Sequence, residues 1–295
     1  MNNLALTVKR TWLVALLLLL AALLPACTVV KVAYNQLDTL LYWRLDGYAD
    51  FTREQAPRVQ ESLAQFHQWH RRTQLPAYAE LLQRLRPKLA GSISPEQACS
   101  MFDQVRGAAD ATLDPAQWTL VWMATELTEE QLRKIEKKQA SNDADWRKEW
   151  LVNMTPEKLL DARFEKALSR SEMLYGNLDG PQKAALRAGL GASSFDPSRS
   201  YAERQRREHD LLNVLRKINA DKLDTEQARA LLAAYMGRAL LPPDLADQRY
   251  TQMLVRDGCA TFSRLHNSTT PAQRAQAAVT LDRYTRDFRL LIAQR

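Results

Sequence analysis

The chain has 295 residues and a formal net charge of +7, with 46% hydrophobic and 25% charged residues. This composition is that of an ordinary globular protein and excludes a largely disordered chain. The positive surplus is small for this length, so a solvated surface of mixed charge is expected rather than a nucleic-acid-binding surface.

The first feature along the chain is an apolar segment near the amino terminus. Two cations precede an uncharged run over residues 11–24, and the segment ends in Leu24-Pro25-Ala26-Cys27. A basic region, an apolar core and a small residue before the cut are the features of a secretory signal. The order of leucine, small residues and cysteine resembles the lipobox of bacterial lipoproteins, although proline is unusual at its position. This resemblance implies cleavage between Ala26 and Cys27 and acylation of the Cys27 thiol.

Two other interpretations of this segment stay open. A retained transmembrane anchor needs about 20 apolar residues, and this run is shorter and ends in a Pro-Ala-Cys break. An ordinary secretory cleavage would leave an unanchored protein, but the small-x-small pattern that it prefers is absent before Cys27. We therefore expect a signal peptide over residues 1–26 and a lipid-anchored chain over residues 27–295. By analogy with lipoprotein sorting, Thr28 favours the outer membrane of a Gram-negative bacterium, facing the periplasm.

Two further cysteines, Cys99 and Cys259, remain once Cys27 is assigned to the anchor. The periplasm is oxidising, so a disulfide between them is one expectation. Closing so long a loop would stabilise the fold by about 4 to 5 kcal/mol in the chain-entropy model. Two separately buried thiols are an equal alternative.

A helix-start signature recurs along the rest of the chain. An apolar residue is followed by Ser, Thr or Asp as the cap, often by Pro, and by Gln or a similar residue three places after the cap. The cap oxygen accepts a hydrogen bond from an otherwise unpaired backbone N–H, and the glutamine can reach back to the cap. The caps are Ser94, Asp114, Thr128, Thr155, Asp179, Thr270 and, as a near variant, Asp224. So many helix starts, with only nine glycines, predict an all-α protein.

The apolar spacing agrees with this fold class and predicts an array of about 11 to 12 helices with no sheet. The expected helices cover residues 30–48, 56–74, 76–90, 94–111, 114–125, 128–150, 155–176, 179–190, 198–222, 225–240, 244–266 and 270–293. Their starts are unevenly spaced, so a compact array is favoured over a tandem repeat. A subdivision near 189–200 is one interpretation of a stretch that equally fits a loop within one domain.

Two blocks near the amino terminus, residues 34–46 and 67–78, resemble a proteobacterial lipoprotein family that is carried only as a domain of unknown function. The resemblance covers most of the chain after Cys27 and implies an exported, acylated, helical protein without an established activity. A weaker likeness lies at 127–131, where Leu-Thr-Glu-Glu-Gln is similar to the Leu-Thr-x-x-Gln motif of Spy/CpxP-type periplasmic chaperones. That motif is also a good capping box. The other helix starts depart from its leucine-threonine form, and this chain is longer than the single module of those chaperones.

The residues that could carry chemistry form no recognisable catalytic or metal-binding motif. His67 and His70 are three residues apart and could share a helix face. The sequence has no closely spaced pair of cysteines and no His-Glu-x-x-His motif, so no metal and no cofactor are expected. Gly-x-Ser-x-Gly and glycine-rich phosphate loops are also absent. Asp143 and Asp145 are interpreted as part of a solvated face. We therefore expect neither an enzyme nor a small-molecule substrate, and no nucleic-acid partner.

A short aromatic and basic segment is the candidate binding surface. It consists of Trp69, His70, Arg71 and Arg72. A hairpin of the helices expected at 56–74 and 76–90 would bring it near further cations, where it could meet lipid phosphates or acidic partners. A solubilising helix end is the simpler interpretation. Packing, rather than ligand binding, is expected for the His70 ring and for the later tryptophans, such as the 146/150 pair.

The sequence thus predicts an outer-membrane lipoprotein that binds an envelope protein partner without catalysis, as a scaffold, adaptor or assembly factor. A membrane-tethered holdase chaperone is the alternative, and it requires an exposed apolar cradle. An envelope hydrolase without a recognisable motif is the second alternative. It requires a polar cleft with perturbed carboxylates.

Overall fold

The structure, a computed structural model, describes residues 26–294. Within that range its regular elements are all helices, and it has no strand. Residues 1–25 of the signal peptide expected over residues 1–26 lie outside the described residues, whereas Ala26 and Cys27 open the first described helix. The helices are α2 (Ala26–Asn35), α3 (Leu37–Ala49), α4 (Gln55–Leu85), the 3-10 helix η1 (Arg86–Leu89), α5 (Pro95–Glu126), α6 (Glu129–Trp150), α7 (Pro156–Tyr175), α8 (Gly180–Gly191), α9 (Pro197–Ala220), α10 (Thr225–Leu240), α11 (Leu245–Ser268) and α12 (Pro271–Ala293). The all-α prediction is confirmed.

The capping signature marks true helix starts at all but one of its positions. Each confirmed cap accepts a hydrogen bond from the backbone N–H three residues later, and in five of them the glutamine there binds the cap N–H in return. Thr155 also caps α7, because its hydroxyl oxygen accepts a hydrogen bond from the backbone N–H of Lys158. With lysine in place of glutamine three residues after the cap, no reciprocal bond forms there. Asp114 begins no helix, because α5 runs on through Pro115.

Two predicted helix boundaries are wrong because a proline lies inside a continuous helix. Pro76 lies within α4, as Pro115 does within α5. An interior proline removes one backbone hydrogen bond and costs about 3 kcal/mol. Leu75 and Ala79, on either side of Pro76, are buried, so packing stabilises a continuous α4 at this site. The expected hairpin does not form, and the helix expected at 30–48 is instead divided at Gln36 into α2 and α3.

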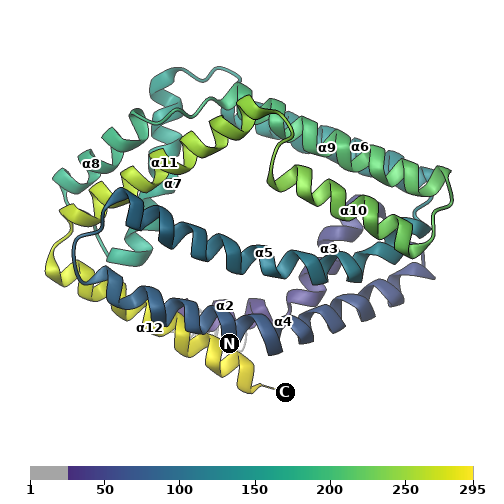
Figure 1. The fold of residues 1–295 in the computed structure, drawn as a ribbon, viewed down its shortest axis with the longest axis horizontal. Helices are drawn as coiled ribbons and strands as arrows, with labels where there is room; N and C mark the ends of the chain where they lie inside the picture. The colour runs from purple at the N-terminus through teal and green to yellow at the C-terminus, as the bar shows by residue number, and fades with distance from the viewer. Residues whose placement is uncertain (1–25, 295) are drawn as a thin grey trace, which may run out of the picture.

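The helices form an elongated frame (Figure 1). The long helices α4 and α5 run along its length and pack on each other, and α12 packs along α4. One end is built from α6, α9 and α10 against the end of α5, and the other from α7, α8 and α11. The buried apolar residues fall into separate clusters at these two ends, with a smaller cluster between α3, α4 and α5.

Residues 192–196 connect α8 to α9 and correspond to the middle of the predicted subdivision. This short connection is tied to α11, because the Ser194 N–H donates to Asp257 (2.7 Å) and the Asp196 N–H donates to the Tyr250 hydroxyl (2.8 Å). Phe195 packs edge-on against Trp150, with 6.2 Å between ring centroids. The stretch is therefore held against α11 by hydrogen bonds and against the end of α6 by an aromatic contact.

Capping glutamines pair across helices at two places in the frame. Gln131 of α6 donates to Gln55 of α4 at 2.8 Å, and Gln182 of α8 donates to Gln273 of α12 at 2.7 Å. In both pairs, each glutamine also donates to the backbone carbonyl five residues before its partner. Gln131 and Gln182 are buried. The same local arrangement therefore joins α4 to α6 and α8 to α12.

Candidate functional site

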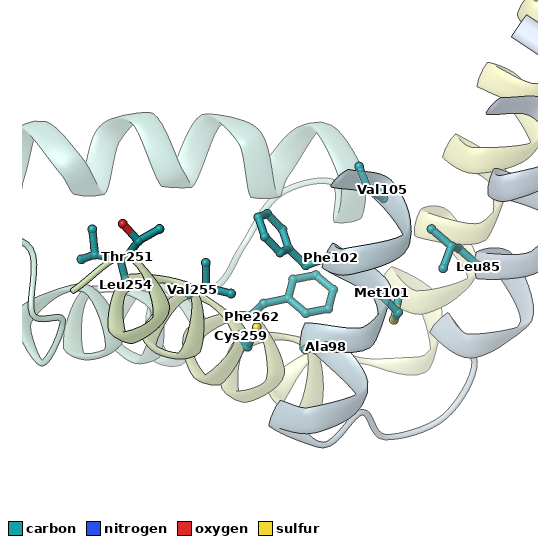
Figure 2. A pocket seen from close by; sticks show the side chains of 11 residues that line it. Leu85, Ala98, Met101, Phe102, Val105, Thr251, Leu254, Val255, Cys259 and Phe262 are labelled. Carbon is teal, nitrogen blue, oxygen red and sulfur yellow. The ribbon is translucent and has the colours of Figure 1, made fainter. Parts of the chain in front are cut away.

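An apolar groove lies between α5 and α11 (Figure 2) and has a volume of about 540 Å³. Figure 2 shows that its side chains come from facing surfaces of the two helices, with Leu85 of α4 at one side. Its lining residues, called the groove below, are Leu85, Ala98, Met101, Phe102, Val105, Thr251, Leu254, Val255, Gly258, Cys259 and Phe262.

The groove follows from helical spacing on both walls. Ala98, Met101, Phe102 and Val105 recur every three or four residues on α5, and the lining residues of α11 do the same from Thr251 to Phe262. Large apolar residues on one helix face are usually buried against a neighbour. Here Phe102 and Val105 stay 45% and 48% exposed, so this part of the stripe has no partner within the described chain.

Among its described lining residues, the groove offers an incoming molecule no free side-chain hydrogen-bond donor. Its one hydroxyl group, on Thr251, already donates to the backbone carbonyl of Asp247 at 2.9 Å. Gly258 lies on the open side of α11, where an added Cβ would meet no atom within 4 Å. Apolar contact and shape are therefore what the groove can use for recognition.

The two groove walls are joined covalently. Cys99 of α5 and Cys259 of α11 form a disulfide with an S–S distance of 2.10 Å and a Cα–Cα distance of 5.3 Å. Of the two alternatives for this pair, the structure has the disulfide rather than two separate thiols. It links positions 160 residues apart and fixes the spacing of α5 and α11 at the buried side of the groove.

The predicted surface at 69–72 is divided by the structure. His70 points inward, where its Nδ1 lies 2.9 Å from the Tyr34 hydroxyl oxygen, and Trp69 packs against Phe66. Burial, with a smaller contribution from His67, lowers the pKa of His70 to about 4, so its ring is neutral near pH 7. Packing is thus the role of His70, as expected, although it lies within α4 and not at a helix end.

Arg71 and Arg72 instead line a second, polar cavity of about 540 Å³. The Arg71 guanidinium donates to the Asn35 side-chain oxygen (2.8 Å) and to the backbone carbonyl of Gln294 (3.1 Å). Arg72 is exposed and makes no ion pair among residues 26–294. The lining residues, called the polar cavity below, are Asn35, Asp38, Ala64, His67, Gln68, Arg71, Arg72, Ile292 and Gln294.

A buried charge cluster between α6 and α9 corrects the prediction for Asp143. This residue is buried, and its carboxylate accepts a hydrogen bond from Arg204 at 2.5 Å. The same guanidinium binds Glu208 at 2.6 Å, so one cation serves two carboxylates. Burial, helped by the Asp143 charge and opposed by Arg204, raises the pKa of Glu208 to about 7. Asp145 does match the prediction of a solvated face, since it is exposed and pairs with Lys148.

Among residues 26–294, no set of three or more His, Cys, Asp or Glu side chains is placed to hold a metal ion. His67 and His70 are directed to different partners, Asp38 and Tyr34. In the same part of the chain, no helix has both the length and the hydropathy to cross a bilayer.

Comparison with known proteins gives a family and no described relative. No curated protein and no solved structure matches the chain. The model of a family of unknown function, DUF6279, matches residues 47–233, which include all of α4 to α9 and therefore the α5 wall of the groove. Because this match covers more than half of the sequence, the chain belongs to the DUF6279 family.

Proposed function

We propose that this protein is a non-catalytic binding factor of the cell envelope. In this proposal it is anchored in the outer membrane through acylated Cys27, its helical body faces the periplasm, and the groove holds an envelope protein partner. The observation that carries the proposal is the groove itself, whose Phe102 and Val105 expose apolar surface at its mouth. Covering such side chains is worth about 25 cal/mol per Å² of apolar area removed from water.

The chemistry of the groove favours a helical segment of the partner. The lining of α11 spans residues 251–262, which is three turns or about 16 Å of helix. A helix satisfies its own backbone hydrogen bonds, whereas an extended strand would bring unpaired N–H and C=O groups against apolar walls. The apolar stripe of an amphipathic helix fits these walls by packing alone. A scaffold or adaptor that receives one such helix is the leading function.

A membrane-tethered holdase is the second candidate, and the absence of a free hydrogen-bond donor among the described groove side chains favours it. A site without hydrogen-bonding groups sets no register along its ligand, so apolar segments of many unfolded proteins would fit. The groove is also concave and partly exposed, as a holdase surface must be.

In-cell photo-crosslinking separates the two candidates. A photoreactive amino acid replaces Val105, at the mouth of the groove, or Arg133, an exposed residue of α6 that serves as the control position. One discrete adduct from position 105 alone would identify an adaptor, and a ladder of unfolded envelope proteins from that position would identify a holdase. Equal adducts from both positions, or none from 105, would refute the groove as the binding site.

A further inference from the structure

We propose that the polar cavity binds a phosphate group, and that the phosphate comes from the headgroup of an anionic membrane lipid beside the anchor. The choice of the lipid rests on the proposed anchoring at Cys27. The binding of phosphate itself rests only on the cavity.

The two arginines of the polar cavity make no ion pair with a carboxylate among residues 26–294. The hydrogen bonds of Arg71 go to uncharged groups, namely the Asn35 carboxamide, the backbone carbonyls of Leu291 and Gln294, and the Nε2 atom of the His67 ring. Arg72, the next residue, is exposed and has no ion pair among residues 26–294. A guanidinium presents its donors in a planar fork that matches phosphate oxygens, so Arg72 can donate to an anion in the cavity. The Nη atoms of Arg71 already have partners, and this residue adds its positive charge beside that fork.

The other polar groups of the polar cavity leave this charge in excess. Among the described lining residues, Asp38 is the one acid, and its carboxylate lies 3.8 Å from the His67 ring. Burial and the Arg71 charge lower the pKa of His67, while Asp38 acts in the opposite direction. His67 is therefore neutral near pH 7, and the lining carries one net positive charge together with the Gln68 amide as a further donor.

The position of the polar cavity points to the membrane as the source of the phosphate. Asn35 is eight residues along α2 from Cys27, which is about 12 Å of helix. The helices next to the anchor also expose large apolar side chains, with Val32 at 58% and Trp43 at 64%. Trp43 lines a neighbouring cavity that shares Asp38 with the polar cavity. Exposed tryptophan beside cations is the pattern found at membrane–water interfaces.

Native mass spectrometry of the full-length acylated protein in a neutral detergent tests this inference. The probes are dioleoyl phosphatidylglycerol, zwitterionic dioleoyl phosphatidylcholine and inorganic phosphate. We expect one phosphatidylglycerol adduct that binds at least about tenfold more tightly than phosphatidylcholine. Arg72→Gln should weaken it about tenfold, and Arg72→Lys should retain part of the affinity. Arg133→Gln, which removes an exposed cation of α6, is the matched control and should leave it unchanged.

Arg72 is chosen because its exposed side chain has no hydrogen bond or ion pair to lose among residues 26–294, whereas Arg71 also joins α2 to the end of α12. Arg72-dependent binding of inorganic phosphate without a lipid adduct would overturn the lipid as the source. If lipid adducts form equally with both headgroups and are unchanged by Arg72→Gln, the polar cavity is not the binding site. If Cys27 carries no lipid, phosphate binding remains measurable, so failure of the anchor and failure of the polar cavity give different results.

Discussion

Replacing Gln182 by Ala tests whether the paired glutamines hold the two helix starts together. Gln182 is 1% exposed and takes part in four side-chain hydrogen bonds: two with Gln273, one to the Ser268 carbonyl and one from the Asp179 N–H. Its removal also leaves the Ser268 carbonyl without this partner. A buried polar group left unpaired costs about 1 to 3 kcal/mol. We therefore expect Gln182→Ala to lower the free energy of unfolding by about 2 to 4 kcal/mol.

Gln227→Ala is the matched control, because Gln227 belongs to a capping box of the same kind but is exposed and pairs with no second glutamine. Gln227→Ala should lower the free energy of unfolding by only about 0.5 to 1 kcal/mol. Urea unfolding followed by circular dichroism measures both variants. The double variant Gln182→Ala/Gln273→Ala should lose less than the sum of the single losses, since the two side chains share bonds. Equal losses for Gln182→Ala and Gln227→Ala, or additive losses in the pair, would refute the reasoning.

Three further predictions concern the disulfide, the charge cluster and the anchor. Reducing the Cys99–Cys259 bond, or replacing both cysteines by Ser, should lower the free energy of unfolding by about 4 to 5 kcal/mol, and an unchanged urea midpoint would contradict this. The pKa of Glu208 is about 7 in the folded protein and 4.5 ordinarily, so the folded state binds the proton more tightly and stability should fall as pH rises from about 5 to 8. Thermal unfolding should show this fall in the wild type and a smaller one in Glu208→Gln; identical profiles would show that Glu208 does not titrate there. Cys27→Ser should abolish fatty-acid labelling and leave an unprocessed precursor, whereas retained labelling would exclude Cys27 as the acylated residue.

Local sequence signals predicted the fold well where the physics is local. A cap oxygen and a glutamine three residues later act within one turn, so the starts of α6, α8, α10 and α12 could be read directly. The same signature failed at Asp114, because the proline that would suit the first turn of a new helix lies here inside a continuous one, at an energetic cost that the local signature does not reveal. Tertiary packing decides between those outcomes, and it is not visible in a short window of sequence.

The sites depend on contacts between distant residues, which explains what the sequence missed. The local sequence predicts a solvated Asp143, because its partner Arg204 lies 61 residues away on α9 and is not part of the local pattern. The apolar residues of α5 and α11 gave a normal helical stripe, and nothing in their spacing distinguished a buried face from an open groove. Arg71 and Arg72 were recognised as a candidate surface, but the separation of His70 and Trp69 from them follows from the close approach of α2.

The most direct test of the proposed function fills the groove and measures capture from its mouth. Gly258→Leu places a side chain on the open side of α11, and Gly107→Leu adds the same group to an exposed glycine of α5 outside the groove. Both glycines have free space at Cβ, so the helix itself tolerates either change. With the photoreactive residue at Val105, Gly258→Leu should reduce the crosslinked fraction about tenfold, as expected for the loss of about 1.4 kcal/mol of apolar contact. Gly107→Leu should leave the fraction unchanged. An equal crosslinked fraction in the two variants would contradict the assignment of the groove as the partner site.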